Sequence, residues 1–208
     1  MVAMVPPAPR APSRPAAAGS VRIIGGRWRG SKLPVASAPG LRPTSDRARE
    51  TLFNWLQPML PGARVLDLFA GSGALGLEAL SRGAAGALLV ERDPALAESL
   101  RATCARLGAG EATVLRADAL ELLRAPLHGR FDRVFVDPPF SDGLWAEVLA
   151  RLDPWLADDA WLYLESAPGA GPAPGAGWRL HREAGTRDAH HALYRRMPPA
   201  AGPGAASR

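Results

Sequence analysis

Apolar and polar positions change along the chain in blocks that predict strands and helices in turn. The run 65–69 is apolar except for Asp67, which is typical of a strand buried on both faces. A glycine turn at 71–73 follows, and residues 74–81 carry helix formers with leucines spaced to face a sheet. Residues 88–90 predict the next strand, which Glu91 ends. Residues 65–91 are therefore predicted to form one strand–turn–helix–strand unit.

The same alternation continues toward the C-terminus. It predicts helices at 93–107, 119–124 and 144–156 and strands at 112–116, 131–136 and 161–165. Strands that alternate with helices indicate right-handed crossovers and a parallel, doubly wound sheet. The runs 178–182 and 189–196 predict a terminal hairpin on the sheet edge. The expected fold class is α/β.

The N-terminal part has a different pattern. Residues 21–35 predict a small hairpin around Gly25-Gly26, and residues 41–46 introduce a helix that Thr44 or Ser45 caps. In that helix, large apolar residues predict a buried face. Arg47, Arg49 and Glu50 in its first turns form either an exposed charged face or a surface that lies over the cofactor or RNA. We expect a disordered tail at 1–20, a basic nucleic-acid-facing unit at 21–60, the main domain at 61–197 and a second disordered tail at 198–208. The stretch 168–177 is low-complexity and predicts a flexible loop.

The distribution of charge along the chain is more informative about function than the overall composition. The chain has 24 arginines, one lysine and a net charge of +5, but its Ala, Gly, Pro and Arg content is what a GC-rich genome produces. Residues 1–60 carry nine basic and two acidic side chains, a net charge of +7 that leaves −2 for residues 61–208. Concentrated positive charge before the main domain indicates a polyanionic partner.

Other classes of protein find little support in the sequence. No apolar run approaches the 18 residues of a membrane span, and no secretory signal is read, so the cytoplasm is expected. The single cysteine, Cys104, excludes an internal disulfide and predicts a buried thiol. His190 and His191 are adjacent, so they point to opposite faces of a strand and make a poor metal pair. We expect no metal and a monomer.

The basic segment surrounds an aromatic side chain with cations. Basic groups interleaved with an aromatic suit a phosphate backbone and a stacked base. The alternative, equally supported by this segment, is an edge hairpin with the indole packed on the core. The residues concerned are Arg22, Arg27, Trp28, Arg29, Lys32 and Arg42.

Three carboxylates end successive strands of the predicted sheet: Asp67, Glu91 and Asp118. Ligands of such sheets bind at these strand ends, so the three side chains are expected to rim one crevice. Glu91 lies about 20 residues past the glycines, where a carboxylate usually holds a ribose diol. The spacing of Gly71, Gly73 and Gly76 also fits a dinucleotide-binding turn. A carboxylate near the turn favours S-adenosylmethionine, which has an amino-acid end and no phosphate, over a pyrophosphate.

A second motif, Asp137-Pro138-Pro139-Phe140, follows a buried strand. Two prolines stiffen the chain and present the Asp137 oxygens and the Pro138 carbonyl as acceptors. Acceptors so placed can bind both hydrogens of an exocyclic base amine, and Phe140 can stack on the base. Asp137 can then receive the amine proton or pass it to water. An ordinary strand-ending turn is the alternative.

Together these motifs carry a family resemblance. The segments RIIGGRWRGSKLPV, LRPTSDRARETLFNWL, LDLFAGSGALGLEALSRGA, FVDPPF, WLYLES and LHRE resemble the bacterial 16S ribosomal RNA guanine-N2 methyltransferase family of the RsmD type, from about Val21 to Arg196. The resemblance implies a class I S-adenosylmethionine-dependent methyltransferase with a seven-stranded, mostly parallel sheet. It also implies methylation of guanine 966 in a small-subunit assembly particle.

The resemblance assigns roles to residues at the matching positions. Binding of S-adenosyl-L-methionine falls to Asp67, Phe69, Ala70, Gly71, Ser72, Gly73, Glu91, Arg92, Asp118 and Ala119. The target guanine meets Asp137, Pro138, Pro139 and Phe140, and the RNA meets Arg22, Arg27, Trp28, Arg29, Lys32, Arg42, Thr44 and Arg47. Two alternatives are another nucleic-acid amino-methyltransferase, acting on adenine N6 of DNA or RNA, and a non-catalytic RNA-binding assembly factor.

Overall fold

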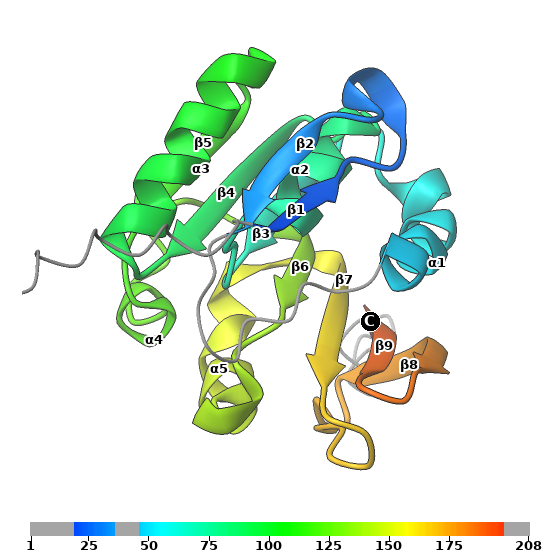
Figure 1. Cartoon of the computed structure of the whole chain (residues 1–208). Coiled ribbons are helices and arrows are strands. Elements are labelled where there is room, and N and C mark those ends of the chain that lie inside the picture. The colour runs from blue at the N-terminus through cyan, green and yellow to red at the C-terminus, as the bar shows by residue number, and fades with distance from the viewer. Residues whose placement is uncertain (1–18, 36–45, 198–208) are drawn as a thin grey trace, which may run out of the picture.

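A twisted sheet of seven strands forms the centre of the computed structural model, which describes residues 19–35 and 46–197 (Figure 1). The strand order is β5-β4-β3-β6-β7-β9-β8. Strands β3 to β7 pair in parallel, and β9 runs antiparallel to both β7 and β8. The strands are β3 (Arg64–Asp67), β4 (Gly86–Glu91), β5 (Ala112–Arg116), β6 (Phe131–Val136), β7 (Leu156–Ser166), β8 (Trp178–Gly185) and β9 (His190–Arg196). The predicted mostly parallel sheet with a terminal hairpin is confirmed.

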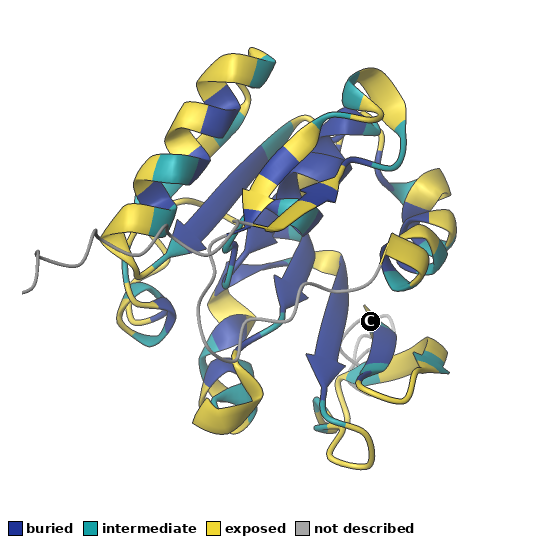
Figure 2. Ribbon diagram, viewed as in Figure 1, coloured by how far each residue is buried: buried dark blue, intermediate teal, exposed yellow. Residues whose placement is uncertain are grey.

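Helices cover both faces of this sheet, because successive residues of each strand point to opposite sides. One apolar cluster joins Val65, Leu89 and Phe135 to α1 (Asp46–Leu56), α2 (Ala74–Ser81) and α3 (Pro94–Leu107). The other cluster joins Leu66 and Val134 to α4 (Ala119–Leu122) and α5 (Trp145–Leu152). Figure 2 shows the resulting buried strands between helices whose outer faces are exposed. Short 3-10 turns complete the fold: η1 (Gly26–Trp28), η2 (Gln57–Met59), η3 (Phe140–Asp142) and η4 (Asp153–Trp155).

The N-terminal hairpin is part of the same core. Its strands are β1 (Gly19–Arg22) and β2 (Lys32–Val35), so strand pairing includes the last two residues of the tail expected at 1–20. The tail prediction is wrong for Gly19 and Ser20, because the antiparallel ladder extends to the pair Gly19 and Val35. Apolar side chains on one face of the hairpin, such as Ile23 and Leu33, are buried in the cluster under α1 and α2.

A buried carboxylate fastens the hairpin to α2. Glu78 is fully buried and accepts hydrogen bonds from the backbone N–H groups of Ile24 (2.6 Å) and Gly25 (2.8 Å). It also accepts a hydrogen bond from Arg82 Nε at 2.6 Å. Gly26 has φ +72°, and a Cβ there would lie 1.8 Å from the Ser81 carbonyl oxygen, so only glycine allows this close approach. The hairpin therefore sits directly on the helix that follows the glycine turn.

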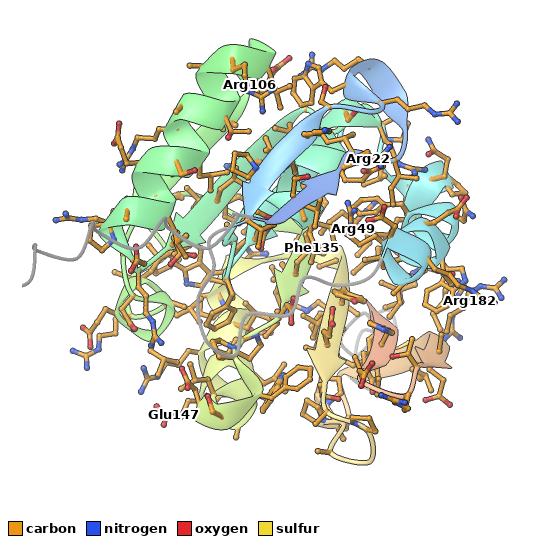
Figure 3. All side chains as sticks on the ribbon, in the orientation of Figure 1. Arg22, Arg49, Arg106, Phe135, Glu147 and Arg182 are labelled. Atoms are coloured by element: carbon orange, nitrogen blue, oxygen red, sulfur yellow. The ribbon has the colours of Figure 1, made fainter. Side chains whose placement is uncertain are left out.

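Arg49 corrects one expectation. Its side chain does not belong to an exposed charged face: it is fully buried and lies between α1 and β1, near Arg22 in Figure 3. Arg49 Nη2 donates to the Arg22 carbonyl at 2.8 Å and to Asp46 at 2.6 Å, and Nη1 lies 3.8 Å from Glu78. The buried guanidinium is compensated at Nη2 by a carbonyl and a carboxylate and at Nη1 by the charge of Glu78, whereas Nε and Nη1 make no hydrogen bond within the described residues.

Other boundaries differ by a few residues. The helix expected at 144–156 ends at Leu152, because Pro154 continues the chain as the turn η4. Strand β7 begins at Leu156 rather than at residue 161. The proposed caps Thr44 and Ser45 lie outside the described residues. Cys104 is buried, as predicted, and burial raises the pKa of its thiol. In the described ranges, no helix is long and apolar enough to cross a membrane.

Candidate active site

The glycine turn between β3 and α2 is open on one side and tightly packed on the other. Gly71 and Gly73 have φ of +50° and +78°, a region that glycine adopts at little cost. A Cβ on Gly73 would lie 2.6 Å from a methyl of Leu100, so this residue packs closely on α3. A Cβ on Gly71 would meet no atom within 4 Å. The backbone is therefore exposed to a ligand at Gly71.

Asp67, at the end of β3, stabilises the glycine turn and the start of α2. Its side chain is buried, and Oδ2 accepts a hydrogen bond from the N–H of Gly76, in the first turn of α2, at 3.0 Å. Burial raises the pKa of the Asp67 carboxyl to about 7, although hydrogen bonds from Gly76 and Phe69 oppose the shift and the nearby Glu91 adds to it. The carboxyl thus holds the start of α2 in place.

Glu91 ties the end of β4 to the same turn. Its Oε2 accepts from the N–H of Gly71 at 2.9 Å, and its Oε1 accepts from the N–H of Asp93 at 2.8 Å. Each carboxylate oxygen has a further lone pair, so the half-buried group can still accept hydrogen bonds from a diol. The ribose contact expected at Glu91 stays a prediction.

The next residues place two more side chains at the carboxyl ends of the strands. Arg92 is exposed and forms an ion pair with Asp142 at 3.2 Å, which links the loop after β4 to the loop after β6. Because β3 lies between β4 and β6, this ion pair joins the loops on either side of the glycine turn. Asp118 caps α4: its Oδ1 accepts from the N–H groups of Leu120 (2.9 Å) and Glu121 (3.1 Å). The adjacent Ala119 is buried.

The motif 137–140 follows β6, the neighbour of β3. Asp137 is half-buried, Pro138 is buried and Pro139 is exposed. The carbonyl of Pro139 accepts from the N–H of Asp142 at 3.0 Å, which closes η3. Phe140 is 39% exposed, with its ring centroid 6.0 Å from that of Trp145. Sheet order therefore brings the motif beside the glycine turn, and part of the Phe140 side chain is accessible at the surface.

The basic residues of the hairpin lie at the surface. Arg22, Arg29 and Lys32 are exposed, and Arg27 forms a two-bond pair with Glu111 at 2.9 and 2.8 Å. Trp28 is half-buried against the core, and the Arg27 guanidinium lies 4.0 Å from its ring centroid. Of the two alternatives for this indole, the packed one fits the geometry. Arg47 is exposed at the start of α1, whereas Arg42 and Thr44 lie outside the described residues.

Several buried polar side chains of the described ranges were not predicted, and they include the following two sets. The first is Glu78, whose signal is a carboxylate within the apolar helix 74–81. The second comprises Tyr163, Glu165 and His191, which share one sheet face between β7 and β9. The Tyr163 hydroxyl donates to Glu165 at 2.9 Å and lies 2.7 Å from His191 Nδ1. Burial and the charges of Glu165 and Asp137 raise the pKa of the Tyr163 phenol well above its ordinary value.

Metal ligands do not gather in the part of the chain that the structure describes. Residues 19–35 and 46–197 contain no group of three or more His, Cys, Asp or Glu side chains arranged to hold a metal ion. His190 pairs with Glu183 at 3.2 Å, while His191 points into the core.

Known proteins similar to this chain are methyltransferases by name. The family model described as "Conserved hypothetical protein 95" matches residues 21–195. The Escherichia coli protein named ribosomal RNA small subunit methyltransferase D is 52% identical over 181 residues, which cover 86% of this chain and 91% of that protein. Its Haemophilus influenzae namesake is 41% identical over 185 residues, covering 86% and 96%. The solved structure of Escherichia coli yhhF aligns with a TM-score of 0.79 at 51% identity, covering 87% of this chain and all of that one.

Proposed function

The chain belongs to the family described as "Conserved hypothetical protein 95", the RsmD family of methyltransferases, and we propose that it methylates the exocyclic N2 of guanine 966 in 16S ribosomal RNA. The predicted family and enzyme class are confirmed. The observation that carries the proposal is the position of the 137–140 motif, at a strand end next to the glycine turn, which Glu91 contacts from the strand on its other side. Donor and acceptor sites are thereby neighbours.

The residues at the crevice fit S-adenosyl-L-methionine. Space above Gly71 admits a ligand close to the backbone, and the remaining lone pairs of Glu91 suit a ribose diol. We assign the methionine end to the turn, formed by Phe69, Ala70, Gly71, Ser72 and Gly73 over Asp67. We assign the ribose to Glu91 and Arg92 and the adenine to Asp118 and Ala119. When bound, this donor supplies an electrophilic methyl group on a sulfonium sulfur.

The 137–140 motif orients the nucleophile. Asp137 and the Pro138 carbonyl accept hydrogen bonds from the two amine hydrogens of the guanine. This favours a pyramidal nitrogen whose lone pair points toward the donor. Pro138 and Pro139 keep the acceptors rigid, and Phe140 stacks on the base to set its angle. With the donor bound, the methyl group would pass from the sulfur, which would leave as a neutral thioether, to the amine nitrogen, and the acidified amine proton would pass to Asp137 or to water.

The substrate class follows from the relatives' names and the surface charge. A small-subunit assembly particle presents phosphates that suit the exposed cations of the hairpin and of α1, namely Arg22, Arg27, Arg29, Lys32 and Arg47. Arg42 and Thr44 belong to the same proposal by resemblance. Such a particle places the reaction in the cytoplasm, and we propose that the protein works as a monomer.

Transfer of labelled methyl groups to small-subunit particles that lack the modification tests this proposal. Nucleoside analysis should show N2-methylguanosine at one site. Asp137→Ala should lower kcat at least about 100-fold while the Kd for the donor stays unchanged. Asp158→Ala, which removes an exposed carboxylate paired with Arg130, is the matched control and should behave as wild type. Label on adenine or DNA would overturn the substrate, and an Asp137→Ala variant with full activity would overturn the mechanism.

A further inference from the structure

A cleft of about 400 Å³ lies between α1 and the end of the β8–β9 hairpin. In Figure 1 these elements face each other beside β7. One side of the cleft is a single face of α1, which carries Arg47, Thr51 and Trp55. The other side is formed by the turn at Gly185 and Thr186 and by His191. Its volume falls in the range of small-ligand pockets, roughly 300–1,000 Å³.

His191, which lines this cleft, carries an unsatisfied polar atom. The residue is only 4% exposed, and its Nε2 is a buried atom that no donor or acceptor of the described residues contacts. The single Tyr163 hydroxyl proton goes to Glu165, so His191 Nδ1 donates its own proton to the Tyr163 oxygen. In the neutral ring, Nε2 is then an acceptor. A buried acceptor without a partner is costly and points to a ligand that carries an N–H or O–H group.

The cleft adjoins the proposed site of methyl transfer. His191 pairs with Glu165 across β9 and β7, and Val136 pairs with Leu164 across β6 and β7. The next residue, Asp137, therefore comes level with Glu165. Phe53 of α1 contacts Phe135, which in turn contacts Tyr163, so α1 covers the same face of the sheet. Only β7 separates β6 from β9, so Asp137 and the cleft lie about 10 Å apart at roughly 4.7–4.9 Å per strand, a distance that neighbouring nucleotides of one RNA strand can span.

We propose that the cleft binds a nucleotide that flanks the target guanine, with an N–H group of its base donating to His191 Nε2. This inference rests on the proposed function, because it assumes an RNA substrate. Trp55 is half-buried and offers part of an indole to the base, a contact that suits any nucleobase. The exposed guanidinium of Arg47 at the rim suits the phosphate. A peptide would also carry N–H donors, but it would not need the aromatic wall and the cation together.

Filling the cleft from α1 tests the proposal without disturbing the buried cluster. Thr51→Trp places an indole in the cleft, whereas Asn54→Trp places it on an exposed position of the same helix outside the cleft. With small-subunit particles lacking the modification as substrate, Thr51→Trp should raise KM at least about tenfold, with kcat nearly unchanged. Asn54→Trp should match wild type. Donor affinity and the melting temperature, measured alongside, should be the same for all three proteins.

A second pair of variants tests the polar contact itself. His191→Leu and His191→Gln both lose the bond to Tyr163, but only glutamine keeps a polar group near the position of Nε2. We expect a higher particle KM for His191→Leu than for His191→Gln. The subsite is overturned if folded Thr51→Trp retains the wild-type KM, or if His191→Leu and His191→Gln are alike. A wild-type protein that binds the donor but methylates no particle would instead overturn the proposed function, and the subsite with it.

Discussion

Replacing Glu78 by glutamine should strongly destabilise the protein. The fully buried carboxylate binds Ile24 N–H, Gly25 N–H and Arg82 Nε within 2.8 Å and lies 3.8 Å from Arg49 Nη1. Glutamine keeps the shape of the side chain but loses the charge. Its NH₂ group takes the place of one carboxylate oxygen and therefore faces an N–H donor, with which it cannot form a hydrogen bond. Arg49 would remain fully buried with less compensation. Breaking a buried ion pair costs about 3–5 kcal/mol, and each hydrogen bond to a charged group contributes about 1.5–3 kcal/mol.

We therefore expect Glu78→Gln to lower the free energy of unfolding by about 3–5 kcal/mol, out of a total of about 5–15 kcal/mol. Urea unfolding followed by tryptophan fluorescence measures this loss. Glu121→Gln is the control, because its pair with Arg124 at 3.0 Å is exposed on both sides. It should stay within about 0.5 kcal/mol of wild type. The double variant Glu78→Gln/Arg49→Met should recover part of the loss. A Glu78→Gln protein within about 1 kcal/mol of wild type would refute this account of the hairpin.

Three further predictions concern protonation, backbone conformation and salt. The folded-state pKa of Asp67 is raised to about 7, so its contribution to stability is complete below the unfolded pKa and is lost as pH rises through 7. Between about pH 8 and pH 5, the free energy of unfolding of the wild type, measured with urea, should rise by about 2–3 kcal/mol relative to that of Asp67→Asn. A difference between the two proteins that does not change with pH would count against the burial argument. Gly26→Ala should be less stable than Gly30→Ala by at least about 1 kcal/mol. Both glycines have positive φ, but only a Cβ at Gly26 would clash with a backbone oxygen. Equal melting temperatures of the two variants would contradict this. Raising the salt concentration from about 50 to 200 mM should weaken particle binding by orders of magnitude. The double variant Arg29→Ala/Lys32→Ala should reduce the slope of log K against log salt concentration by about 1.5. An affinity that does not change with salt would show that the hairpin does not bind RNA.

Local chemistry made much of the fold predictable. The bounds of α2, 74–81, agree with the sequence because Gly73 and the glycine at 83 punctuate a run of helix formers. Strand β6 agrees as well, since Asp137-Pro138-Pro139 ends an apolar run. Strand β7 starts five residues earlier than expected, because Asp158 and Asp159 look like loop residues although they lie on an exposed part of the strand. A strand whose exposed part is polar is hard to separate from a loop before its partner is known.

Side chains whose partners lie far away in sequence could not be placed in this way. Arg49 looked like a surface residue because nothing within its own helix indicates that a buried carboxylate, Glu78, lies beside it in the fold, 29 positions later in the sequence. The cluster around His191 depends on the register between β7 and β9, which no local pattern specifies. Trp28 left two alternatives open for the same reason: whether an indole packs inward or faces solvent depends on what lies behind it. Pairing geometry, not residue type, decides all three.

The same pairing has a consequence for RNA binding. A basic arm that becomes ordered only on binding loses conformational freedom at that moment, which weakens its net affinity. Here the hairpin is held before binding, by Glu78 and by the Trp28 N–H that donates to Ser81 Oγ at 3.0 Å. Both partners lie on α2, whose first turn Asp67 fixes at the glycine turn. One rigid helix therefore sets the distance between the exposed cations and the crevice. If the hairpin binds RNA as proposed, loosening it at Glu78 should weaken both particle binding and the alignment of the guanine at Asp137, so KM should rise and kcat should fall together.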